Sequence, residues 1–406
     1  METGLGMKIR MLLAGVFFLA AALSAAPVRT LTITKQAEDN PRIYFSGMPE
    51  NPELSREVSS FLKVCGWFDM GTKERSDYVL DLRGAGELVS AELSIGGAPV
   101  GAWKFRNVGN ARAAAKLIVD TLIERSFKEL RVRSFCNSRI AFCAETSPGV
   151  RNIYLCDLDG GDVEQLTNFK SLCVEPCWNP DGTSVFYSKY GRSGIDVVET
   201  TVRKPRMSRV VSSFRGINTG AALSPDGRKL AIILSPDHKV DLYLMDLVTR
   251  KLTRLTKGVS VEASPCWSPD GRTIAYVSDE SGSPRIHLVG IDGRNRRRLP
   301  TIGSDAVTPD WSGDGKIVFA SRTGGSYTLG VYDTANGSCR RITEAPGNWE
   351  SPAWAADNRQ VVCKRTWGGK SGLFVVDTRT GRVRELLSTR YPLSMPAWSP
   401  CAPARR

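Results

Sequence analysis

One turn motif recurs six times in the chain and limits its possible folds more than any other feature. Its clearest copy is Ser-Pro-Cys-Trp-Ser-Pro-Asp-Gly at residues 264–271. The copies are spaced 43 to 45 residues apart and are centred on Trp178, Leu223, Trp267, Trp311, Trp354 and Trp398. A repeat of about 40–50 residues with a turn in each unit is typical of β-propeller blades, which have four strands each.

Each repeat contains the signals of four short strands. The Pro-Asp-Gly turn ends a first strand, because proline fixes φ and glycine accepts the left-handed corner. An apolar run follows, as at residues 274–277, and a third strand ends in aspartate, as at residues 242–246. A glycine-containing hairpin then leads to a short fourth strand, as at residues 254–256.

The two ends of the repeat region predict how the ring closes. The region begins at residues 139–142 with a second strand that no turn motif precedes, and the sixth motif stops at Pro400 with no second strand after it. The two half-blades can complete each other, which leaves no open sheet edge. We therefore predict a mainly β fold, in which a six-bladed β-propeller at residues 136–402 is closed by its N- and C-terminal strands.

The repeated tryptophans and aspartates are expected to be structural. A ligand-binding residue rarely recurs in every blade, so we interpret the tryptophans as packing residues between neighbouring blades. The aspartates of the Pro-Asp-Gly turns are interpreted as turn formers rather than as a carboxylate cluster.

The N-terminus has the pattern of an export signal. Lys8 and Arg10 precede an apolar run at residues 11–23, and small residues follow at 24–26. That run is too short to span a membrane as a helix. We expect residues 1–24 to be a signal peptide, with cleavage after Ser24 or Ala26 as the open alternatives, and a soluble mature protein in the periplasm.

Residues 27–133 are expected to form a small α/β domain before the ring. Strands are predicted at residues 28–33, 42–45, 67–70, 78–82, 88–95 and 100–105. Asn51 is expected to cap a helix that starts at Pro52, and a second helix is predicted at residues 110–127. The inward face of this second helix is expected to carry Ala114, Leu117, Ile118 and Leu122.

Composition argues against metal or nucleophilic chemistry. The chain has two histidines and ten cysteines, with a net charge of +13. His238 and His287 lack the neighbours that catalysis requires, so we expect no catalytic residue, no cofactor and no metal site. The cysteines fit either small buried apolar residues or disulfides. Export disfavours nucleic acid as a partner.

The two faces of the ring differ in their side chains. The face with the loops that lead into each first strand, here called the channel face, carries Glu175, Glu262, Asp305 and Glu350, with Trp349 and Tyr391 as candidate aromatic anchors. These residues could also be ordinary solvated loop residues.

The opposite face is basic, and our hypothesis is that it contacts anionic envelope material such as lipid headgroups or wall polymer. Solvated turns are the simpler alternative. Its positive residues are Arg203, Lys204, Arg206, Arg228, Arg250, Lys251, Arg272, Arg294, Arg296, Arg297, Lys316, Arg379 and Arg382.

The export signal, the α/β domain, the six motifs and the end at Pro396-Ala397-Trp398-Ser399-Pro400 together resemble the TolB family of the Tol-Pal envelope system. The resemblance implies a non-catalytic protein that binds the lipoprotein Pal over the channel face. By similarity this role falls on Ile217, Asn218, Thr219, Val261, Glu262 and Ala263. It also implies an N-terminal switch segment that contacts TolA, here Val28, Arg29, Thr30, Leu31, Thr32 and Ile33.

The sequence therefore favours a monomeric periplasmic interaction protein that supports outer-membrane integrity and envelope constriction in cell division. The alternative is a periplasmic propeller that binds or hydrolyses a peptide or glycan in its channel. Three features depart from the family pattern: the ten cysteines, the short N-terminal domain and the apolar residue at Ile217.

Overall fold

The computed structural model describes residues 40–85, 88–106, 110–127 and 136–401, all within one compact unit of residues 38–406. The expected signal peptide, the segment 28–33 and most of the linker before the ring lie outside the described residues. Among the helices that the structure describes, none combines the length and apolarity needed to cross a membrane.

An α/β domain comes first in the described chain. Its five-stranded sheet has the order β2-β1-β3-β4-β5, in which β1 is parallel to β2 and β3 and the other pairs are antiparallel. The strands are β1 (Arg42–Phe45), β2 (Asp69–Met70), β3 (Tyr78–Ala85), β4 (Leu88–Ile95) and β5 (Ala98–Arg106). The helices are α1 (Pro52–Val64), the short η1 (Lys73–Arg75) and α2 (Ala111–Ser126).

Both long helices begin at asparagine caps, as predicted for the first. The Asn51 side chain accepts a hydrogen bond from Leu54 N at 3.0 Å, and Asn110 accepts one from Ala113 N at 2.6 Å. The prediction for Leu117 is wrong, because this side chain is 39% exposed. The buried face follows positions 114, 118 and 122 together with 115, 119 and 123, and residue 117 lies about 100° away from residue 118 around the helix.

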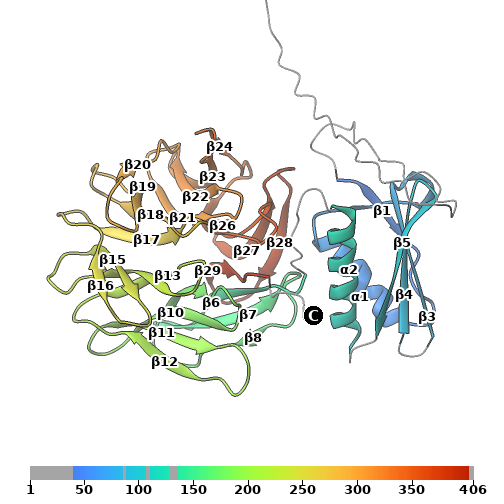
Figure 1. The fold of residues 1–406 in the computed structure, drawn as a ribbon, viewed down its shortest axis with the longest axis horizontal. Helices are drawn as coiled ribbons and strands as arrows, with labels where there is room; N and C mark the ends of the chain where they lie inside the picture. The colour runs from blue at the N-terminus through green and yellow to red at the C-terminus, as the bar shows by residue number, and fades with distance from the viewer. Residues whose placement is uncertain (1–39, 86–87, 107–109, 128–135, 402–406) are drawn as a thin grey trace, which may run out of the picture. The chain divides into compact units, whose positions relative to one another are not determined.

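Six four-stranded sheets are arranged around a common axis (Figure 1). Blade 1 contains β29 (Leu393–Trp398), β6 (Arg139–Ser147), β7 (Val150–Asp157) and β8 (Glu164–Gln165). Blade 2 contains β9 (Cys173–Trp178), β10 (Ser184–Tyr190), β11 (Ile195–Thr201) and β12 (Ser208–Ser212). Blade 3 contains β13 (Asn218–Leu223), β14 (Lys229–Leu234), β15 (Asp241–Asp246) and β16 (Leu252–Arg254).

The remaining blades repeat this order. Blade 4 contains β17 (Glu262–Trp267), β18 (Thr273–Ser278), β19 (Arg285–Gly290) and β20 (Arg297–Arg298). Blade 5 contains β21 (Ala306–Trp311), β22 (Lys316–Thr323), β23 (Ser326–Asp333) and β24 (Cys339–Arg341). Blade 6 contains β25 (Asn348–Trp354), β26 (Gln360–Trp367), β27 (Lys370–Asp377) and β28 (Val383–Ser388).

The ring closes in blade 1, as the sequence predicted. The last strand, β29, pairs with β6 in antiparallel register from Leu393 opposite Ala144 to Trp398 opposite Ile140. A strand from the C-terminus therefore supplies the inner edge of a blade whose other strands begin the propeller. This pairing satisfies backbone groups that would otherwise form an open sheet edge.

Three of the repeated tryptophans, Trp178, Trp267 and Trp354, tie neighbouring blades together, which confirms a structural role for them. The indole N–H of Trp178 donates to Ala397 O at 3.0 Å, and that of Trp267 donates to Ala222 O at 2.9 Å. In each case the acceptor carbonyl belongs to the first strand of the preceding blade. The blades are thus joined by hydrogen bonds as well as by apolar packing.

The motif aspartates form turns, as predicted. The Asp270 carboxylate accepts hydrogen bonds from Ser268 Oγ at 2.6 Å and from Arg272 N at 3.0 Å. These hydrogen bonds, with that from Ser268 the larger influence, lower the pKa of Asp270. Asp226 makes the same two contacts in blade 3.

The ten cysteines form no disulfide within the described part of the chain, and most of them are buried. The sequence left disulfides open as an alternative, and the structure forms none between these thiols. Burial raises the pKa of Cys143 to about 12 and that of Cys177 to about 11, so both remain protonated at neutral pH. These residues act as small apolar side chains.

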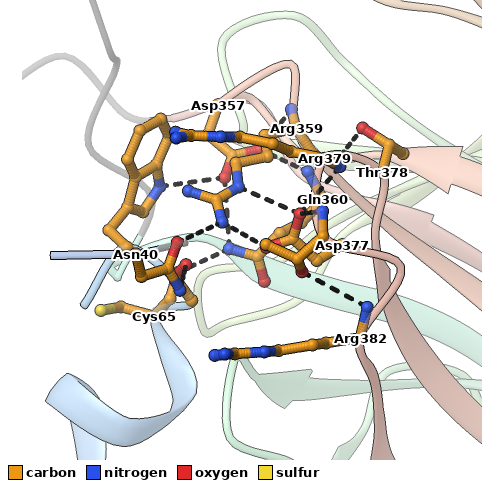
Figure 2. Close-up of polar contacts among 12 residues, drawn as sticks. Asn40, Cys65, Asp357, Arg359, Gln360, Asp377, Thr378, Arg379 and Arg382 are labelled. Carbon is orange, nitrogen blue, oxygen red and sulfur yellow. Dashed lines mark hydrogen bonds and ion pairs between the residues drawn. The ribbon is translucent and has the colours of Figure 1, made fainter. Parts of the chain in front are cut away.

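A buried polar cluster joins blade 6 to the α/β domain (Figure 2). Arg359, which is 5% exposed, donates from Nε to Asp377 Oδ1 at 3.1 Å and from a terminal nitrogen to Asn40 Oδ1 at 2.7 Å. Its guanidinium also lies 4.7 Å from the centroid of the Trp67 ring. Gln360 Nε2 donates to Cys65 O at 2.6 Å. The two parts of the chain are therefore held together by directional polar contacts.

Candidate functional site

The first strands of all six blades line a channel along the propeller axis with a volume of about 950 Å³. Each of these strands has a register shift against the second strand of its blade. At each shift one residue adopts a left-handed backbone with φ between 47 and 61°. These residues are Glu175, Gly220, Ser264, Thr308, Ser351 and Met395.

This ring of left-handed residues is costly for the fold. A non-glycine residue in this conformation costs roughly 1–2 kcal/mol, and such positions cluster where a protein binds a partner. Only Gly220 in the ring is a glycine. In most blades a proline follows, as Pro265 follows Ser264, so the bend is built into the sequence of the first strand.

Glu175 lies in this wall and bridges two blades. Its Oε2 atom accepts hydrogen bonds from Ser188 Oγ at 2.9 Å and from Gly220 N at 3.0 Å, and Thr219 Oγ1 donates to the same atom. Glu175 and Ser188 belong to blade 2, whereas Thr219 and Gly220 belong to blade 3. The carboxylate therefore holds the channel wall together, and a partner would contact it within this network.

The three candidate residues that lead into blade 3 differ in exposure. Asn218 is buried, its Oδ1 accepts from Phe214 N at 2.8 Å, and its Nδ2 donates to Phe214 O at 2.6 Å. This side chain shapes the loop and is not presented to solvent. Ile217 and Thr219 are half-buried, so they can take part in a contact only with part of their surface.

The candidates that lead into blade 4 show the same division. Val261 is 50% exposed, and Ala263 is half-buried. Glu262 is only 1% exposed, and its Oε1 accepts a hydrogen bond from Ser260 Oγ at 2.8 Å. Burial raises the pKa of this carboxyl. Glu262 therefore cannot contribute to an exposed acidic rim, and Val261 is the surface residue of the group.

The remaining acidic candidates have basic partners. Glu350 Oε2 lies 3.0 Å from Lys364 Nζ, and Asp305 Oδ2 lies 3.8 Å from Arg322 Nη1. Together with the hydrogen-bonded Glu175 and the buried Glu262, these pairs make the channel face less acidic than the sequence suggested. The sequence identifies the acidic residues of these loops, but it does not show which lysine or arginine side chain pairs with each of them.

One of the two candidate aromatic anchors is buried. Trp349 is 0% exposed, donates from its indole N–H to Ala345 O at 2.9 Å and packs edge-on against Phe374. This burial corrects the expectation of an exposed ring. Tyr391 is half-buried, and its hydroxyl accepts a hydrogen bond from Arg390 at 2.6 Å.

The channel face has other exposed aromatic side chains that the sequence analysis missed. Tyr190, Phe214 and Trp367 are 40%, 40% and 58% exposed. Tyr190 ends β10 and Trp367 ends β26, where the second strands turn back on this face, and Phe214 precedes β13. Exposed aromatics are typical anchors of protein interfaces. For Tyr190 and Trp367 the signal was available where second strands turn into third strands, where no candidates were chosen, and Phe214 lies in the same loop as the candidate Ile217.

Asp310 lies deeper, in the channel wall of blade 5. The equivalent positions in the neighbouring blades are Cys266 and Ala353. Its Oδ2 accepts a hydrogen bond from Trp354 N at 2.6 Å, and burial raises the pKa of this carboxyl to about 6. Among the described residues, no group of three or more histidine, cysteine, aspartate or glutamate side chains is placed to hold a metal ion.

The opposite face is basic, but part of its charge is paired. Arg206 contacts Glu164 at 2.8 Å, and Arg296 and Arg382 also form ion pairs. Arg228 and Lys251 are exposed and form no ion pair within the described part of the chain.

Fold and site together define a class: a closed six-bladed propeller, joined to an α/β domain, with exposed aromatic side chains on the face where its channel is lined by bulged strands. The model of the family described as "TolB beta propeller domain" matches residues 128–402. The chain belongs to this family.

Individual relatives match shorter stretches. A "Protein TolB homolog" of Chlorobium chlorochromatii is 31% identical over 138 residues, which cover 33% of this chain and 29% of the relative. The "Tol-Pal system protein TolB" of Desulfosudis oleivorans is 34% identical over 120 residues, covering 29% and 27%. The chain thus matches under a third of the length of these curated relatives.

A solved structure supports the whole fold. The crystal structure of TolB from Acinetobacter baumannii superposes with a TM-score of 0.79 at 20% identity, covering 89% of this chain and 97% of that one. The α/β domain and the propeller therefore occur together in a known protein. At 20% identity, the similarity between the two structures supports a shared fold and nothing further.

Proposed function

We propose that this protein is a non-catalytic periplasmic component of a Tol-Pal system that binds a Pal-type lipoprotein on its channel face. The observation that carries the proposal is that the exposed side chains of Tyr190, Phe214 and Trp367 lie on one face of a propeller of the TolB family, the first two at blade 2 and the third at blade 6. Exposed aromatic side chains are typical anchors for a protein partner.

The contact residues follow from exposure. Val261 is the exposed member of its group, with Ile217, Thr219, Ala263 and Tyr391 contributing part of their surface. Asn218, Glu262 and Trp349 would act indirectly, because they are buried. The segment at residues 28–33 is proposed to contact a TolA-type protein, and through these partners the protein would support outer-membrane integrity and constriction during division.

Changing Val261 to aspartate is expected to weaken binding of the purified soluble domain of a Pal-type lipoprotein about tenfold or more, because a charge would be buried in the interface. The affinity is measured by titration calorimetry. Val248→Asp is the matched control, since Val248 is 82% exposed in a hairpin on the opposite face. If Val261→Asp and Val248→Asp weaken binding of the lipoprotein domain equally, the channel face is not the binding surface.

A pull-down from envelope extract, with and without residues 25–33, tests the two partners separately. We expect the full mature chain to recover both a Pal-type and a TolA-type protein, and the truncated chain to lose the TolA-type protein. Recovery of neither by the full mature chain would contradict the proposed function.

The opposite face is proposed to contact anionic envelope material. Each exposed cation near an anionic surface adds about 1 kcal/mol, and salt screens this attraction. We expect the protein to sediment with vesicles that contain anionic lipid at low salt and to be released as salt rises. Binding that is absent at low salt, or unchanged by salt, would contradict this interpretation.

A further inference from the structure

Two motif tryptophans depart from the hydrogen-bonding pattern of the others: Trp398 in blade 1 donates to Ser138 Oγ, and Trp311 in blade 5 has no acceptor among the described residues. In blades 2, 4 and 6 the motif indole donates to a carbonyl of the preceding blade, as Trp354 Nε1 does to Asp310 O at 3.1 Å. The equivalent acceptor for Trp311 is Cys266 O, and this bond is not formed. The Trp311 indole nitrogen is shielded from solvent and has no hydrogen-bond partner within the described residues. An indole N–H can only donate, so this buried donor marks the point where the seam between blades 4 and 5 differs from the others.

A cavity of about 530 Å³ adjoins this ring, between blades 4 and 5 on the basic face. Its volume falls within the range of small-ligand sites, about 300–1,000 Å³. The walls combine the Trp311 ring with Leu288 and Ile291, which are apolar, and Thr334 from the hairpin of blade 5. The Trp311 ring thus borders a space that can admit a ligand, while its nitrogen stays shielded from that space.

A glycine helps to keep this space open. Third strands end in aspartate at Asp246 and Asp333, whereas β19 ends at Gly290, which lines the cavity. A Cβ atom placed on Gly290 would lie 2.7 Å from Asp292 Oδ1 and 3.2 Å from Arg294 O. Any side chain here would crowd the hairpin, so glycine at this position both shapes the turn and removes an acidic group.

Two guanidinium groups give the cavity its charge. Arg272 and Arg297 are exposed, line the cavity and form no ion pair with a described residue. Asp292 also lines it, but one of its carboxylate oxygens accepts a hydrogen bond from Arg294 N at 2.9 Å. The balance of the three charges is positive, and arginine pairs are well suited to a carboxylate because each can donate two parallel hydrogen bonds.

We infer that this cavity binds the C-terminal end of a peptide whose last residue is apolar. The terminal carboxylate is held by Arg272 and Arg297, and the last side chain packs against Leu288, Ile291 and the Trp311 ring. One such end supplies both the anion and the apolar group that the cavity requires. The site lies away from the channel face and is independent of the proposed Pal-type contact, although Arg272 and Arg297 belong to the basic face.

The test uses the full mature chain with ¹⁵N-labelled tryptophan and the peptide acetyl-Gly-Gly-Leu with a free carboxylate. Trp311→Phe assigns the indole signal. We expect the peptide to shift this signal, and the same peptide with a C-terminal amide to bind at least tenfold more weakly, because it lacks the charge for a charge-assisted hydrogen bond. Arg272→Gln and Arg297→Gln are each expected to weaken binding about tenfold.

Arg228→Gln is the matched control, because Arg228 occupies the position of Arg272 in the blade 3 repeat and is exposed. It should leave the peptide affinity unchanged. An amide that binds as well as the acid, or an indole signal that does not respond, would overturn the inference. Inorganic phosphate alone reproducing the shift would also overturn it, since the site would then recognise only an anion. If vesicles of anionic lipid shift the indole signal and the peptide does not, the inference is overturned, and the cavity recognises a lipid headgroup rather than a peptide end.

Discussion

Replacing Arg359 with methionine is expected to lower the free energy of unfolding by about 3–5 kcal/mol, because it removes one partner of a buried ion pair. Asp377 is 7% exposed and would lose the guanidinium that neutralises it. Asn40 and the Trp67 ring would lose their contacts with the same group. Methionine is chosen because it fills similar space without charge.

The measurement is urea unfolding followed by near-ultraviolet circular dichroism, with the wild-type chain alongside. Arg228→Met is the control, because Arg228 stands at the same position of its repeat but is exposed. We expect it to change stability by less than about 0.5 kcal/mol. A loss below about 1 kcal/mol for Arg359→Met would show that the cluster does not hold the charge as described.

This comparison shows where sequence reasoning stops. Arg228, Arg272 and Arg359 occupy one position of the repeat, yet the first is a solvated turn residue, the second lines a cavity and the third is buried against the α/β domain. The repeat determines the backbone conformation and the strand location of this position. The environment of its side chain depends on what packs against the outside of each blade, and no local pattern encodes that contact.

The fold itself was predictable because its signals are local and repeated. Turn residues, alternating apolar runs and the unmatched half-blades at the two ends predicted the number of blades and their closure through β29 and β6. The predictions of side-chain exposure were wrong where burial depends on packing that the local sequence does not show. Leu117 lies just beside the buried face of its helix, and Trp349 is covered by Phe374 from the next but one strand.

The candidate site was harder to predict for the same reason. The loops on the channel face were located from strand direction alone, but the fate of each side chain was set by neighbours in other strands or blades. Glu175 is held by donors from blade 3, and Glu262 is buried beside Ser260. Conversely, Tyr190 and Trp367 are exposed at the ends of second strands, where the sequence analysis chose no candidates.

Asp310 has the pKa shift in the channel with the clearest consequence for stability. Its pKa rises from the ordinary 3.8 to about 6, because burial disfavours the charged form more than the hydrogen bonds from the Trp354 and Trp311 backbone favour it. The folded state therefore holds this proton more tightly than the unfolded chain does. The carboxyl must cost the fold stability as pH rises from about 4 to about 6, with no further loss above that.

Asp310→Asn is accordingly expected to become more stable relative to the wild type as pH rises through this window. The asparagine oxygen can still accept from Trp354 N, and it carries no charge. Full burial would correspond to about 3 kcal/mol, and because the channel admits water to part of the residue we expect about 1–3 kcal/mol at pH 7. Urea unfolding of both chains from pH 4 to pH 8 measures the difference.

Asp270→Asn supplies the control with the opposite sign. The pKa of Asp270 is lowered by its hydrogen bonds, so its stabilising effect is present above the ordinary pKa and is lost as pH falls. We expect this variant to be less stable than the wild type by a nearly constant amount from pH 4 to pH 8, because its change falls at and below the ordinary pKa of 3.8, whereas Asp310→Asn gains stability within this range. If the Asp310→Asn difference stays flat from pH 4 to pH 8, the carboxyl is solvated through the channel and titrates as it does in the unfolded chain.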